Sequence, residues 1–162
     1  IIYSKIIIMI KKILKSITGP IRIGVTTSKT LMYFWLKKDL GSIKSELAID
    51  LAGGAMTNKK FFITKKYICV DLDEEKLKLG TNNYPGTLAI NDKIENYMSK
   101  YNQEKPDLLV CIQTMGINEK FDHNQTLIVI KMIYDLLKPG GNMIFNVGKV
   151  ANLSLTKKEL NN

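Results

Sequence analysis

Acidic and small residues follow two of the apolar segments in the middle of this chain. Asp50 precedes a short run of alanine and glycine, AGGA, that starts at residue 52. Small residues let a backbone approach a ligand closely, and the N–H groups that open a following helix attract polar groups. Asp71 ends the next apolar segment, about 20 positions further on, where a carboxylate can hold both hydroxyls of a ribose. This spacing predicts a site for a polar ligand that contains a ribose.

Short apolar runs alternate with polar segments from Glu46 onward. We expect the runs to be strands buried on both faces, because they are short and rich in Val, Ile and Leu. Polar segments long enough for crossover helices lie between them. The alternation predicts right-handed βαβ units and a doubly wound, mainly parallel α/β sheet, with its ligand at the carboxyl ends of the strands. The expected strands are residues 47–51, 67–70, 87–90, 108–112 and 143–147, and the expected crossover helices are residues 56–63, 74–80, 93–101 and 125–137.

Two helices are expected ahead of this sheet. Residues 4–17 form an amphipathic pattern, Gly19-Pro20 interrupts it, and residues 28–38 form a second helical pattern. The sequence therefore predicts an N-terminal helical cap over residues 1–45 and a ligand-binding α/β domain over residues 46–162. The alternatives are a first helix that lies on a membrane surface, or two helices that form a lid over a bound ligand.

The composition argues against several classes of protein. The net charge of +9 comes almost entirely from scattered lysines, with Arg22 as the only arginine, whereas surfaces that recognise bases favour arginine. No apolar stretch approaches the ~20 residues of a transmembrane helix. Cys69 and Cys111 lie inside apolar runs, as small buried hydrophobes do, so we expect a protein of the reducing cytoplasm.

Several motifs occur in a characteristic order. AIDLAGG, YICVDLDEEKL, LAIND, PDLLVCIQTMG and LLKPGGNMIFNV follow one another through the middle of the chain. This order resembles the class I S-adenosylmethionine-dependent methyltransferases. The resemblance implies a Rossmann-like methyltransferase core, S-adenosylmethionine as cofactor, S-adenosylhomocysteine as product, and methyl transfer as the reaction.

The resemblance also implies roles for individual residues. The family has an acid-x-Gly-x-Gly-x-Gly loop that cups the methionine part of the cofactor, and Asp50 and Gly54 match its acid and second glycine. Asp71 would bind the ribose hydroxyls and Leu72 would line the adenine. Asp92 would accept the adenine amino group, and the backbone N–H of Lys93 would assist. The complete implied cofactor set is Asp50, Ala52, Gly53, Gly54, Asp71, Leu72, Asp92, Lys93, Gln113 and Thr114.

The sequence departs from the family pattern at both the loop and the C-terminal side. Ala52 stands at the first glycine position and Met56 at the third. Alanine fits where the backbone has a negative φ, while a methionine would crowd the following helix or the ligand. The residues after 147 are too few for the family's sixth and seventh strands, so these C-terminal strands are expected to be missing. The bare sheet edge would then need a covering homo- or hetero-oligomer, or a strand at residues 151–155.

Two hypotheses therefore stay open. One is an active methyltransferase whose acceptor is a small molecule, with a nucleic acid as the alternative acceptor. The other is a catalytically degenerate methyltransferase-like subunit or scaffold that requires a partner chain. The sequence predicts no catalytic residue and no metal site. His123 is expected to be solvated at a helix start, and Asp73 is expected to be a helix N-cap.

Overall fold

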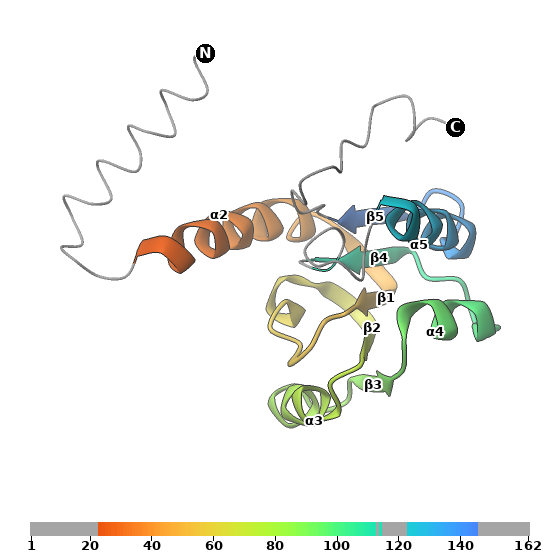
Figure 1. Cartoon of the computed structure of the whole chain (residues 1–162), viewed down its shortest axis with the longest axis horizontal. Coiled ribbons are helices and arrows are strands. Elements are labelled where there is room, and N and C mark those ends of the chain that lie inside the picture. Colours follow the sequence, from red (N-terminus) through yellow and green to blue (C-terminus); the bar gives the residue numbers. More distant parts are fainter. Residues whose placement is uncertain (1–22, 113, 115–122, 146–162) are drawn as a thin grey trace, which may run out of the picture. The chain divides into compact units, whose positions relative to one another are not determined.

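A five-stranded parallel sheet forms the centre of the C-terminal part of this chain (Figure 1). The computed structural model describes residues 23–112, 114 and 123–145. The strand order is β3-β2-β1-β4-β5, and every neighbouring pair is parallel. The chain moves outward from β1 to β3, returns to the other side of β1 and continues to β5, so the predicted doubly wound sheet is confirmed. The strands are β1 (Lys44–Leu51), β2 (Ile63–Asp71), β3 (Leu88–Asn91), β4 (Leu108–Cys111) and β5 (Asn142–Phe145).

Four α-helices and one 3₁₀ helix are described with the strands. Helix α3 begins after Asp73, whose carboxylate accepts a hydrogen bond from the Lys76 N–H at 3.0 Å, as expected of an N-cap. The acids Glu74 and Glu75 in its first turn complement the helix dipole. The elements are α2 (Ile23–Leu40), η1 (Lys59–Phe61), α3 (Glu74–Asn83), α4 (Ile94–Lys100) and α5 (His123–Leu136).

The prediction of a crossover helix at residues 56–63 was wrong. Turns and the short η1 connect β1 to β2 instead. Met56 has a φ of +57°, which an α-helix cannot include. Phe62 is already extended, and the aromatic and β-branched residues from Phe61 onward favour a strand. The loop after β1 therefore leads into a turn and not into a helix N-terminus.

The two faces of the sheet differ in what covers them. Alternate strand residues such as Ile49, Val70 and Leu109 pack with residues of α4 and α5 in one apolar cluster. The intervening residues, among them Asp50, Tyr67 and Cys69, are also buried and point to the opposite face. There Phe62 packs edge-on against Tyr67, with the ring centroids 5.1 Å apart. Asp50 and Tyr67 thus place polar groups inside an otherwise apolar layer.

Asp107 joins the start of β4 to the start of β1. Its two carboxylate oxygens accept hydrogen bonds from the backbone N–H groups of Glu46 (2.9 Å) and Leu47 (3.0 Å). Partial burial raises the pKa of Asp107, but these hydrogen bonds outweigh it and hold the pKa below its ordinary value. Asp107 therefore has a structural role at the edge opposite the predicted site.

The chain divides into two compact units, Ile1–Asp39 and Leu40–Asn162. Within α2, the rings of Phe34 and Trp35 meet edge to face, and Trp35 is half exposed. No helix among the described residues is long and apolar enough to cross a membrane. The predicted helix at residues 4–17 and the predicted strand at residues 151–155 lie outside the described residues, as do the last two positions, 146–147, of the predicted fifth strand.

Candidate functional site

The predicted site residues lie at the carboxyl ends of neighbouring strands. Leu51 of β1 is in register with Val70 of β2 and with Cys111 of β4, and Asp71 is in register with Asn91 of β3. Because all these strands are parallel, the residues that follow them meet at one edge of the sheet. The point where the strand order reverses lies between β1 and β4. The topology thus assembles the loop after β1 with the residues that end or follow β2, β3 and β4.

The loop after β1 has an alternating backbone conformation. Ala52, Gly54 and Met56 have φ values of +58°, +53° and +57°. These are the three positions where the acid-x-Gly-x-Gly-x-Gly pattern places glycine, the residue that tolerates such values without strain. The loop therefore keeps a backbone conformation suited to three glycines although two of the positions carry side chains. The alanine at position 52 does not have the negative φ that would make it unstrained.

The Met56 side chain packs against helix α3. It is fully buried, and a Cβ added to Gly80 of α3 would lie 2.6 Å from its Cγ. The Thr87 hydroxyl also contacts its sulfur at 3.3 Å. The absence of a side chain at Gly80 thus makes room for the methionine between the loop and α3.

Asp71 holds the loop in place. Its Oδ2 accepts a hydrogen bond from the Gly54 N–H at 2.8 Å, and its Oδ1 accepts one from the Asp73 N–H at 2.9 Å. Each carboxylate oxygen has two lone pairs, so one on each remains for a ligand. The carboxylate is half-buried beside Leu72, whose side chain is 67% exposed and offers an apolar surface at the strand end.

Asp50 lies beneath the same loop. Its side chain is fully buried, and its Oδ2 accepts a hydrogen bond from the Tyr67 hydroxyl at 2.6 Å. A Cβ on Gly53 would lie 2.7 Å from this oxygen and 2.6 Å from the Cys69 sulfur, so only glycine fits there. Burial raises the pKa of Asp50 to about 7, and the negative charge of Asp71 adds to the rise, whereas hydrogen bonds from Tyr67 and Asn58 lower it.

The remaining predicted residues are placed less distinctively. Asp92 accepts hydrogen bonds from the Lys93 N–H (2.8 Å) and from the Asn96 side chain (3.2 Å), so it also orders the start of α4. The Thr114 hydroxyl donates to the Ile112 carbonyl at 3.4 Å, and Gln113 lies outside the described residues. His123 is the first residue of α5. Among the described residues, no group of three or more acidic, histidine or cysteine side chains could hold a metal ion.

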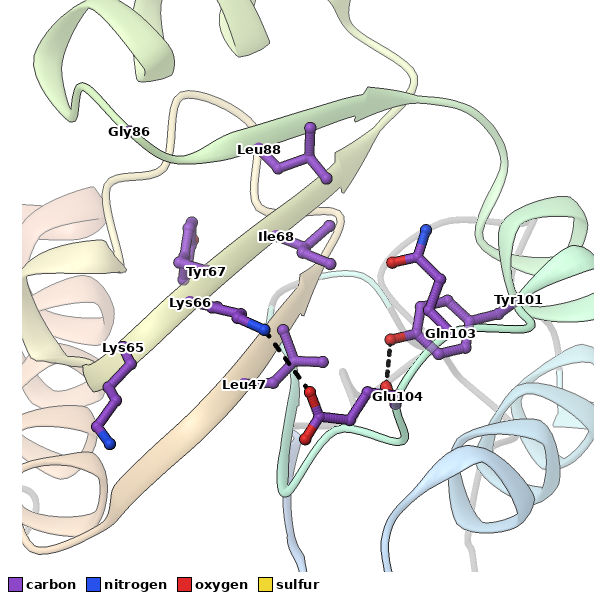
Figure 2. A pocket seen from close by; sticks show the side chains of 10 residues that line it. All are labelled: Leu47, Lys65, Lys66, Tyr67, Ile68, Gly86, Leu88, Tyr101, Gln103 and Glu104. Carbon is purple, nitrogen blue, oxygen red and sulfur yellow. Dashed lines mark hydrogen bonds and ion pairs between the residues drawn. The ribbon is translucent and has the colours of Figure 1, made fainter.

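A separate pocket of about 260 Å³ lies at the amino-terminal side of the strands (Figure 2). Leu47, Ile68 and Leu88 form its apolar part, and Lys66 reaches toward Glu104 at 3.7 Å. None of the predicted cofactor residues lines it. Because ligands of doubly wound sheets bind at the carboxyl ends of the strands, we place the functional site at that edge and not in this pocket.

The contact of Tyr67 with Asp50 was not predicted from the sequence. The strand alternation contained the signal, because Tyr67, Cys69 and Asp71 are spaced by two and share one face of β2. Asp50 pairs in register with Cys69 and projects to this same face. A buried tyrosine needs a hydrogen-bond partner, and Asp50 is the partner within reach.

Only the comparison with solved structures found similar proteins, and those structures agree on the fold. No family model and no curated relative matches the sequence. The structure is similar to the N-methyltransferase NodS from Bradyrhizobium japonicum WM9, with a TM-score of 0.64 and 14% sequence identity, over 82% of this chain and 79% of that chain. NodS in complex with S-adenosyl-L-homocysteine gives a TM-score of 0.62 and 16% identity, over 79% and 66% of the two chains.

Two further solved structures match to a similar degree. An S-adenosylmethionine-dependent methyltransferase from Clostridium acetobutylicum ATCC 824 has a TM-score of 0.57 and 21% identity, over 86% of this chain and 57% of that chain. The sugar N-methyltransferase KedS8 from Streptoalloteichus sp ATCC 53650 has a TM-score of 0.57 and 13% identity, over 75% and 49% of the two chains. The present chain thus spans about half the length of these two proteins. It has the Rossmann-like fold of the class I methyltransferases.

Proposed function

We propose that this chain is an S-adenosylmethionine-dependent methyltransferase that binds its cofactor at the carboxyl edge of the sheet. The observation that carries the proposal is the loop after β1. Three left-handed residues alternate along it, at the glycine positions of the family's cofactor loop, and Asp71 bonds to its central glycine. Asp71 connects the loop to the end of β2, so the two parts of the proposed cofactor site are held together.

The available groups suit the parts of this cofactor. The free lone pairs of Asp71 can accept hydrogen bonds from a ribose diol, and the exposed Leu72 can cover one face of an adenine. The backbone of residues 52–54 would hold the methionine part, with Asp50 beneath it. Asp92 and the backbone of Lys93 are proposed for the adenine amino group, and Gln113 and Thr114 for the side facing the acceptor.

The cofactor supplies an electrophilic methyl group, so the protein has mainly to align donor and acceptor and exclude water. No residue is therefore proposed as a general base. We propose a small molecule as the acceptor, with support from the sugar N-methyltransferase among the similar structures. A nucleic acid is the alternative acceptor. Transfer of labelled methyl groups to a nuclease-resistant, low-molecular-weight fraction would distinguish the two.

The ribose assignment is tested by Asp71→Ala. S-adenosylhomocysteine should bind the variant more than tenfold more weakly in calorimetry, because a charged acceptor for hydroxyl groups is worth about 1.5–3 kcal/mol. Asp73→Ala is the matched control, since that acid also bonds to a backbone N–H but caps α3. Equal affinity of the Asp71 variant and the wild type would remove Asp71 from the site.

The same titration of the wild type separates the two functional hypotheses. Binding of S-adenosylhomocysteine supports the methyltransferase, and a folded protein that fails to bind it would favour the degenerate subunit or scaffold. Two further parts of the proposal are the division into an N-terminal helical cap, residues 1–45, and a cofactor domain, residues 46–162, and a cytoplasmic location. The location is supported by Cys69 and Cys111, which are free, buried thiols.

A further inference from the structure

Asp50 and Tyr67 form a buried polar pair under the loop that the proposed function assigns to the cofactor. Asp50 is fully buried and Tyr67 is 4% exposed, and their oxygens are 2.6 Å apart. The other carboxylate oxygen of Asp50, Oδ1, is buried and accepts no hydrogen bond of ordinary geometry from the described residues, although the neighbouring Asn58 side chain still favours the carboxylate. Burying a charged carboxylate with one oxygen unpaired is unfavourable. The environment of Asp50 therefore favours its protonated, neutral form.

The groups around Asp50 favour its carboxylate only through the hydrogen bonds of Tyr67 and Asn58, and none of them supplies a positive charge. The titratable groups on β2 are Tyr67, Cys69 and Asp71, and on β4 the thiol of Cys111 also feels the charge of Asp50. Burial raises the pKa of both thiols and of the Tyr67 hydroxyl, so these three groups stay neutral near pH 7.

The cations of the β1–β2 connection and of α3 point elsewhere. Lys59 stands over the Tyr67 ring, 5.3 Å from its centroid, and Lys76 pairs with Asp73. No ion pair to Asp50 is formed by the residues that the structure describes. The neighbours therefore leave Asp50 in an environment where an added positive charge would have a large effect.

We propose that Asp50 and Tyr67 are a positioning pair that couples binding of a positively charged ligand at the loop to release of the Asp50 proton. The carboxyl group lies so close to Gly53 that no Cβ fits there, so Asp50 is in direct contact with the backbone of the loop that is proposed to hold the cofactor. S-adenosylmethionine carries a sulfonium that S-adenosylhomocysteine lacks. A cation held on the loop favours the carboxylate, and the O–H bond of Asp50 breaks with its proton passing to the buffer.

Tyr67 sets the pH at which this coupling operates. Its hydroxyl donates to Asp50 and so favours the carboxylate over the neutral acid. Without this donor, Asp50 keeps its proton to a higher pH, and the state that binds a cation is populated less at neutral pH. A purely structural tyrosine would change affinity by the same factor at every pH.

The inference rests on the proposed function, and calorimetry of the full chain with S-adenosylmethionine tests it. The titrations are made at pH 7 in phosphate and in Tris, whose ionisation enthalpies differ, and the affinity is then followed from pH 6 to 8. We expect the wild type to release a fraction of a proton on binding and to bind about tenfold more weakly at pH 6 than at pH 8. S-adenosylhomocysteine should show a smaller release.

Two variants and one control complete the experiment. Asp50→Asn should abolish the proton release, and Tyr67→Phe should move the midpoint of the affinity profile up by about one pH unit, with affinity restored at high pH. Tyr97→Phe, on the other face of the sheet, should match the wild type. Binding without proton release in the wild type, or an unshifted midpoint in Tyr67→Phe, overturns the inference alone. Absence of binding at every pH overturns the proposed function, and the inference with it.

Discussion

At the scale of single residues, the loop after β1 holds two side chains in a backbone conformation that disfavours them. A residue other than glycine in the left-handed region costs on the order of 1 kcal/mol, and Ala52 and Met56 both adopt it. Neighbouring interactions keep them there. The Ala52 N–H donates to the Val70 carbonyl at 2.7 Å, and the Met56 N–H donates to the Gly53 carbonyl at 2.9 Å. The conformation is thus imposed by the connection of β1 to β2.

Ala52→Gly is expected to raise the free energy of unfolding by up to about 1 kcal/mol, because it removes the left-handed strain without removing a buried side chain. Urea denaturation measures the difference. Ala55→Gly is the matched control, since its φ is not positive, and it should lower stability through the added freedom of the unfolded chain. Equal effects of the two substitutions would contradict the strain at position 52.

The raised pKa of Asp50 predicts how the stability of the unliganded protein depends on pH. The folded protein holds this proton up to about pH 7, whereas an unfolded aspartate loses it near pH 3.8. The stability of the wild type should therefore fall as the pH rises from about 4 to 7 and level off above that range. Asp50→Asn removes this dependence, so the free energy of unfolding of the variant relative to the wild type should rise by more than about 1 kcal/mol between pH 5 and pH 8. Denaturation at pH 5 and pH 8 checks this, and a constant difference between the two proteins would contradict it.

At the scale of elements, Met56 packs the loop after β1 against α3. The side chain fills the space over Gly80, and the loop backbone at Ala55 also lies within 3.1 Å of a Cβ added there. Close packing of this kind makes the loop and the helix depend on each other. Met56, at the third glycine position of the pattern, thus packs into the space that the missing side chain of Gly80 leaves open.

Met56→Gly is accordingly expected to lower the free energy of unfolding by about 1–4 kcal/mol, since the cavity it leaves outweighs the relief of strain. Thermal and urea denaturation measure the loss, and Leu79→Ala, an exposed truncation on the same helix, should change stability by less than about 0.5 kcal/mol. Cofactor affinity should persist at temperatures where the variant is folded. A loss of affinity with an intact fold would show that the methionine shapes the ligand-facing side of the loop.

The sequence predicted the position of the candidate site in the fold better than the contacts within it. Asp50 and Asp71 were expected at the carboxyl ends of two strands. Parallel pairing brings these strand ends to the same side of the sheet. The contact between Met56 and Gly80 could not be predicted, since it joins residues of separate elements through the packing of a turn. The bond from Tyr67 to Asp50 depends on strand register, which a single strand pattern does not contain.

At the scale of the whole molecule, the strand pattern predicted more than the helix pattern. The apolar strands could be located because burial on both faces leaves continuous runs of Val, Ile and Leu. The helix predicted at residues 56–63 was wrong because the length of this segment suited a crossover helix, whereas its aromatic residues favoured an extended chain that leads into β2. Parallel strands are usually connected through an α-helix, whereas residues 52–62 connect β1 to β2 through turns and η1.

The sheet has one outer edge beside β5. Among the described residues β5 pairs only with β4, and its residues are partly exposed whereas those of β4 are buried. A strand edge with unpaired N–H and C=O groups invites association with another strand, so natural proteins cover it. We expect this edge to be covered in solution, by a second copy, by another protein or by a further segment of the same chain.

Light scattering combined with hydrogen exchange tests the coverage of this edge. The amides of residues 143–145 should exchange slowly, and β3, the opposite edge strand, is the internal reference for an edge with a single pairing strand. A dimer or larger assembly with slow exchange at β5 identifies an intermolecular cover. A monomer with slow exchange identifies a cover from within the chain. A monodisperse monomer in which β5 exchanges as fast as β3 would mean that the edge is open, and the partner hypothesis would then be wrong.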